Sequence, residues 1–131
     1  MKLRQGRKAL IVMADGYHIG NHGGMAIMVT QEADTLIYTI RIADPQYGNM
    51  WRENLQKISQ VTGGSYFELS RKKGFEQIYA DIEEELRSQY ILSYTPETDA
   101  REGYRRIKVK VNRKGLVANG RDGYYPKNPA K

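Results

Sequence analysis

The sequence predicts an α/β protein in which helices cover both faces of a partial doubly wound sheet of three parallel strands, followed by an antiparallel β meander. Two apolar runs rich in branched residues, 9–14 and 35–43, predict strands that are buried on both faces. Segments with the i, i+3, i+4 apolar spacing of helices alternate with the strands, which is typical of parallel sheets. After Gln89, apolar and basic residues alternate instead, and this period of two indicates antiparallel strands with one solvated face.

The first strand, 9–14, follows a basic leader and ends at Asp15-Gly16. A helix is predicted over 23–33, because its apolar residues recur three and four positions apart. The second strand, 35–43, ends at Asp44-Pro45, since proline cannot continue a strand ladder.

A second helix is predicted over 51–62, and the Gly63-Gly64 pair ends it. A short third strand follows at 65–69, and a third helix at 75–88 carries its apolar residues in one stripe. Right-handed crossovers would place the three strands side by side in chain order, as in a Rossmann-like sheet.

The C-terminal part, residues 90–131, is predicted to form the meander. Strands are expected at 90–95, 104–111 and 116–125, because β-branched and aromatic residues alternate there between turn signals. We therefore divide the chain into a parallel α/β part, 1–89, and an antiparallel β extension packed on or beside it.

Composition excludes several classes. The chain has no cysteine, so a disulfide framework or a thiolate metal site is excluded. Its longest apolar runs fall far short of the roughly 20 residues that span a bilayer, and no apolar segment follows the basic start as a signal peptide requires. With 131 residues, the chain is long enough for one compact domain.

Asp15 follows the first parallel strand, at the edge of the sheet where ligands of doubly wound proteins collect. An unpaired buried carboxylate is prohibitively costly. Asp15 is therefore expected to be solvated, hydrogen-bonded by the loop that follows it, or bound to a cation.

Four segments resemble, in this order, the later strands and helices of the von Willebrand factor type A (VWA) domain, and most closely those of a bacterial branch often found in secreted proteins. They are GRKALIVMADG (6–16), ADTLIYTIRI (33–42), LQKISQVTGGSYFEL (55–69) and IEEELRSQYILSYTP (82–96). In that branch the domain is followed by segments similar to YRRIKVKV (104–111) and GYYP (123–126). By this resemblance, residues 1–89 are the C-terminal half of a VWA-like domain.

The resemblance implies a noncatalytic, adhesion-type module that binds a protein ligand, often through a metal-ion-dependent adhesion site. Asp15 with Gly16 matches the aspartate that the family places after its fourth strand, whereas the Asp-x-Ser-x-Ser and threonine elements of that site have no match. One carboxylate is too few for Mg²⁺, which takes about six oxygens. We expect an incomplete site with no tightly bound cofactor, holding Mg²⁺ only if another chain completes it.

In the family, a further strand pairs with the one matched by Ala9–Ala14. Without that neighbour this strand is expected to be an apolar edge, open to self-association. Either the chain is a fragment of a longer gene product, or a second copy of the chain or its own β meander covers the edge. The resemblance implies a secreted or periplasmic protein, whereas the lack of a signal peptide implies a cytoplasmic one if Met1 is the true start.

Two enzymatic alternatives are weaker. Asp15, His18 and His22 could supply three ligands to Zn²⁺ in a metallohydrolase, but Gly20 and Asn21 oppose the helix that would bring the two imidazoles together. No Gly-x-Ser-x-Gly elbow is present, and both histidines share one loop, so nucleophilic catalysis is not expected.

Charge gives the alternative function, binding of a polyanion such as nucleic acid. Residues 101–131 hold ten Lys and Arg against two acidic residues, so they carry +8 and the rest of the chain −2. A solvated strand face would explain the same pattern. The tyrosines beside these cations could stack on bases, although core or interface packing is the expectation for them. The cations concerned are Arg105, Arg106, Lys108, Lys110, Arg113 and Lys114.

Overall fold

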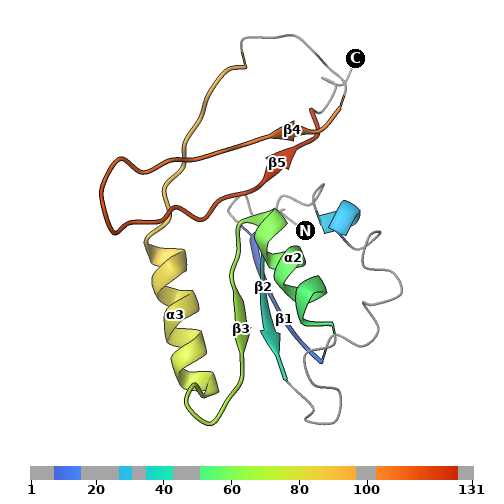
Figure 1. Ribbon diagram of the computed structural model, residues 1–131, viewed down its shortest axis with the longest axis vertical. Coiled ribbons are helices and arrows are strands. Elements are labelled where there is room, and N and C mark those ends of the chain that lie inside the picture. The colour runs from blue at the N-terminus through green and yellow to red at the C-terminus, as the bar shows by residue number, and fades with distance from the viewer. Residues whose placement is uncertain (1–7, 16–26, 31–34, 43–50, 97–102, 127–131) are drawn as a thin grey trace, which may run out of the picture.

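The computed structural model describes residues 8–15, 27–30, 35–42, 51–96 and 103–126. Three parallel strands form one sheet in the order β1-β2-β3, and α2 and α3 follow β2 and β3 (Figure 1). Residues 27–30 are helical and lie within the helix predicted over 23–33, the rest of which is outside the described residues. The bounds are β1 Lys8–Ala14, β2 Thr35–Arg41, α2 Arg52–Thr62, β3 Tyr66–Glu68 and α3 Phe75–Arg87.

Helices cover both faces of the sheet, as predicted, and the side chains of β2 show which helix covers which face. Tyr38 and Ile40 join Phe67 of β3 in an apolar cluster with Ile78 and Ile82 of α3. Successive side chains of a strand point to opposite faces, so the residues between them on β2 face α2. The predicted α/β class and strand order are confirmed.

Polar contacts fix α2 on its face of the sheet. The Thr39 hydroxyl donates to the Leu55 carbonyl at 3.0 Å, and the Ile37 amide donates to the Thr62 hydroxyl at 3.0 Å. At Gly64, just after the helix, a Cβ would lie 2.2 Å from the carbonyl oxygen of Ile37. Only glycine allows this close approach of the two backbones.

β1 is an edge strand. Within the part of the chain that the structure describes, β2 is its one neighbour in the sheet. Leu10 and Met13 are about half exposed and Ile11 is somewhat less so, although all three are large and apolar. β1 therefore presents hydrophobic side chains beside an open edge.

The C-terminal meander is much reduced relative to the prediction. Only β4 (Arg105–Arg106) and β5 (Gly123–Tyr124) pair, antiparallel, where longer strands were expected at 104–111 and 116–125. The strand predicted at 90–95 is wrong, because this segment pairs with no strand among the described residues and its large side chains are exposed. Strand-forming residues do not make a ladder without a neighbour, and a two-stranded ribbon is only marginally stable by itself.

We call residues 103–126 the basic arm. It lies beyond the C-terminal end of α2, at the end of the sheet where β3 begins (Figure 1). A Cβ at Gly63 would lie 3.0 Å from backbone atoms of both Gly120 and Arg121, so the arm meets the end of α2 by direct backbone approach. The Lys57 ammonium of α2 lies 3.5 Å from a carboxylate oxygen of Asp122.

No helix in the described segments is long and apolar enough to cross a membrane.

Candidate functional site

The carboxyl edge of the parallel sheet gathers four charged side chains. Asp15 follows β1, Arg41 ends β2, Glu68 ends β3 and Arg52 begins α2. Because the three strands are parallel, their carboxyl ends meet at one edge, where open α/β sheets bind ligands. This edge is the candidate site.

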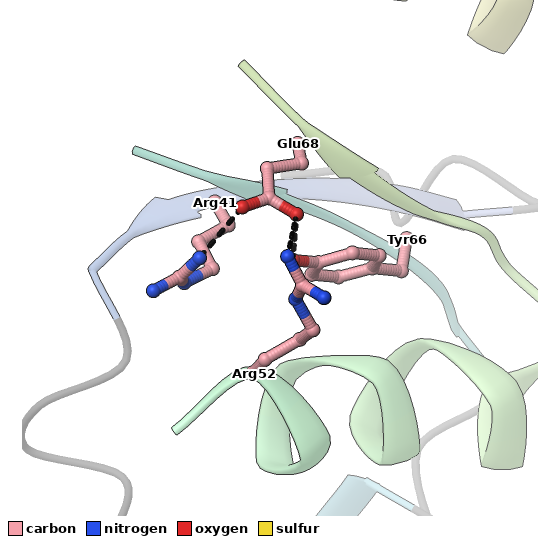
Figure 2. Close-up of polar contacts among 4 residues, drawn as sticks. All are labelled: Arg41, Arg52, Tyr66 and Glu68. Carbon is pink, nitrogen blue, oxygen red and sulfur yellow. Dashed lines mark hydrogen bonds and ion pairs between the residues drawn. The ribbon is translucent and has the colours of Figure 1, made fainter. Parts of the chain in front are cut away.

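Two arginines and a tyrosine converge on Glu68 (Figure 2). Arg41 Nη1 donates to Glu68 Oε1 at 2.6 Å, and Arg52 Nη2 donates to Oε2 at 2.6 Å. The Tyr66 hydroxyl donates to the same Oε2 at 3.3 Å. Both carboxylate oxygens are therefore occupied by donors from three different elements: β2, α2 and β3.

Arg41 is far more buried than the other charged members of this network. The Arg41 side chain is 2% exposed, whereas those of Glu68 and Arg52 are 30% and 34% exposed. Partial burial acts to raise the pKa of Glu68, but the hydrogen bonds and charges of Arg52 and Arg41 outweigh it and hold the pKa below its usual range. Burial, with help from the charge of Glu68, raises the pKa of Tyr66.

This geometry limits what Glu68 can do chemically. A carboxylate with a lowered pKa is a poor proton carrier near neutral pH, because a general acid or base works best with a pKa near the ambient value. Both of its oxygens also accept hydrogen bonds from arginines, whose positive charge opposes a metal ion at the same carboxylate. Glu68 therefore has a structural role, because its hydrogen bonds connect β3 to β2 and to the start of α2.

Asp15 is exposed directly after β1, at the carboxyl edge of the sheet, as predicted. Among the residues that the structure describes, no three histidine, aspartate or glutamate side chains group as a metal site. His18 and His22 lie outside the described residues, so the alternative zinc set with Asp15 stays a prediction.

The six cations proposed for polyanion binding all lie on the basic arm, at the far end of the sheet from Asp15. Arg105 is partly exposed, and Arg106, Lys108, Lys110, Arg113 and Lys114 are exposed. The carboxyl edge and the arm are thus separate surfaces.

The sequence reasoning missed the network around Glu68. A signal was present, because Arg41 and Glu68 are opposite charges at the ends of two strands predicted to be neighbours. Their parallel register places Arg41 directly beside Glu68.

Comparisons of this chain with protein-family models, with curated proteins and with solved structures give no match.

Proposed function

We propose that this chain is a non-enzymatic protein-interaction module that binds its partner along the outer edge of β1. The observation that carries the proposal is an apolar strand with one edge unpaired among the described residues. Such an edge is a template for an added strand, and natural proteins usually block it with charges, proline, bulges or a covering element. Within β1, KALIVMA, the only charge is Lys8 at the start.

The backbone of β1 indicates which residues would pair. The Ala14 carbonyl accepts from the Ile42 amide at 3.1 Å, so the backbone groups of Ala14 point toward β2. The N–H and C=O of one strand residue point to the same side, and the side alternates along the chain. Ala9, Ile11 and Met13 therefore present their N–H and C=O groups outward.

A partner strand beside β1 would bury apolar side chains of β1 on both faces of the sheet. Met13 lies on the α3 face, where its sulfur is 3.8 Å from the Tyr79 hydroxyl. Ile11 shares that face by alternation, and Leu10 lies on the face of α2. All three are substantially exposed, and burial of each such side chain contributes roughly 1–2 kcal/mol, at about 25 cal/mol per Å².

A second copy of the chain is the partner that we propose for this edge. Antiparallel pairing requires that outward residues face outward residues, and a two-fold axis at Ile11 satisfies this by placing Ala9 of each copy opposite Met13 of the other. The two sheets would then join into one sheet of six strands, three from each copy.

Light scattering across a wide range of protein concentration tests the proposal. The unchanged chain should form a dimer. Ile11→Lys should make it monomeric while circular dichroism stays the same, because the two lysines of a dimer would lie opposite each other at the two-fold axis. Val117→Lys, which also places a lysine at an exposed apolar position, is the matched control and should leave the dimer intact. A monomer at every concentration, or a dimer that Ile11→Lys leaves intact, would contradict the proposal.

We also propose an adhesion-type role for the chain. The adhesion-type role fits the resemblance to VWA domains, and Asp15 would then be the remaining position of a metal-ion-dependent adhesion site. Mg²⁺ would bind there only with ligands from another chain, since one carboxylate is too few. For the compartment, we propose secretion or the periplasm, as the resemblance implies.

A further inference from the structure

The basic arm holds the whole net charge of the chain. Residues 103–126 contain seven Lys and Arg and one acidic residue, a net +6, which equals the net charge of all 131 residues. The one acidic residue, Asp122, already lies near Lys57 of α2. The remaining residues contain fourteen charges of each sign, so the charge is concentrated in one segment.

Five cations of the arm are available to a partner. Arg106, Lys108, Lys110, Arg113 and Lys114 are exposed and make no ion pair with any described residue. The first three occupy alternate positions on β4 and the extended chain after it (Figure 1). Alternate residues of an extended chain lie about 6.6 Å apart on one side, which gives an evenly spaced row of positive charge.

Aromatic rings lie at the start of this row, Tyr104 and Tyr125 on the face of Arg106, and Tyr94 and Tyr124 on the opposite face with Arg105. The hydroxyl of Tyr94, from the segment before the arm, is 3.2 Å from that of Tyr124 on β5, and the ring centroids of Tyr104 and Tyr125 are 5.1 Å apart. Core or interface packing was the expectation for the arm's tyrosines: Tyr104 and Tyr124 are partly buried, whereas Tyr125 is 42% exposed. Hydrogen bonds from Tyr94 and Arg105 to the Tyr124 hydroxyl lower the pKa of Tyr124.

We propose that the basic arm binds single-stranded nucleic acid. The exposed cations would follow the phosphates, and the ring of Tyr125, on the same face of the β4–β5 ribbon as Arg106, would stack on a base, the combination that sequence-tolerant single-strand binders use. A sulfated polysaccharide or an anionic membrane would use the cations but would gain no stacking from the tyrosines, and a duplex would hide its base faces. This surface is distinct from the β1 edge, so either proposal can fail alone.

Fluorescence anisotropy with a labelled oligothymidine of about 20 nucleotides tests the proposal. Binding should weaken with salt, and the slope of log K against log salt concentration should be about −3 to −4 if four to six phosphates are neutralised. The double variant Lys108→Glu/Lys110→Glu should weaken binding at least tenfold at about 50 mM salt and reduce the slope. Arg71→Glu/Lys72→Glu, the same charge change at exposed residues outside the arm, should change binding less than twofold.

Stacking separates nucleic acid from other polyanions. Tyr125→Ala should weaken oligothymidine binding by about tenfold, whereas Tyr125→Phe, which keeps the ring, should bind as the unchanged chain does. The same variants should bind heparin, or vesicles with anionic headgroups, equally well. If Tyr125→Ala leaves oligothymidine binding unchanged, or if no salt-dependent binding is seen at about 50 mM salt, the proposal is wrong.

Discussion

Replacing Glu68 with Gln should destabilise the fold strongly, because it leaves two arginines facing a neutral amide at the carboxyl edge. Removing one partner of a fully buried ion pair costs about 3–5 kcal/mol. Arg41 is 2% exposed and fits that case, but Glu68 is 30% exposed and its second partner, Arg52, is 34% exposed, so solvent screens part of the loss. We therefore expect Glu68→Gln to lower the free energy of unfolding by about 2–3 kcal/mol at neutral pH.

Urea unfolding followed by fluorescence measures this loss. The chain has a single tryptophan, Trp51, next to Arg52 at the start of α2, so its emission reports on this edge of the sheet. With a denaturant slope of about 1–3 kcal/mol per molar, the midpoint should fall by about 1–2 M.

The pH dependence gives the second readout. The pKa of Glu68 is lowered in the folded state, so its contribution to stability is complete above the unfolded pKa of about 4.3 and is lost as pH falls through the folded pKa. The difference between the unchanged chain and Glu68→Gln should therefore shrink below about pH 4.

The matched control is Glu83→Gln, which removes a carboxylate from an exposed pair with Arg87 and should cost at most about 0.5 kcal/mol. A cost below about 0.5 kcal/mol for Glu68→Gln, or a cost that does not change with acid, would refute the reasoning.

Three further substitutions test the packing of the sheet by the same unfolding measurement. Gly64→Ala should cost about 3 kcal/mol, because its Cβ would lie 2.2 Å from the Ile37 carbonyl oxygen; a cost under about 1 kcal/mol would mean that the backbones are farther apart. Ile78→Ala should cost about 3–4 kcal/mol, since this fully buried side chain leaves a cavity, and a near-neutral result would remove α3 from the core. Thr39→Val should cost about 1 kcal/mol through the lost hydrogen bond to the Leu55 carbonyl, and an unchanged midpoint would argue against that bond.

The parallel part of the fold could be predicted because its signals are local. The third helix, predicted over 75–88, is observed as Phe75–Arg87, because one apolar stripe defines both its length and its buried face. The segment 90–95 is rich in residues that favour strands, yet it forms no strand in the structure. A strand needs a neighbour as well as suitable residues, and composition does not say where that neighbour is.

The place of Asp15 at the end of its strand could be predicted from the sequence, but the contacts around Glu68 could not. The position of Asp15 follows from the end of an apolar run, so the correct edge of the sheet was predicted. The contacts of Glu68 with Arg41 and Arg52 join residues 27 and 16 positions apart, and they depend on strand register and on where α2 begins. Such contacts are a product of tertiary packing, which local periodicity does not encode.

A disulfide cross-link tests the proposed pairing of β1 most directly. The chain has no cysteine, so Ile11→Cys introduces a single thiol, and the two-fold axis proposed at this residue would bring the two sulfurs of a dimer together. Under mild oxidation Ile11→Cys should form a covalent dimer rapidly, while Val117→Cys, exposed on the basic arm, should stay monomeric under the same conditions. Equal rates for the two variants, or no dimer from Ile11→Cys, would contradict pairing along the edge of β1.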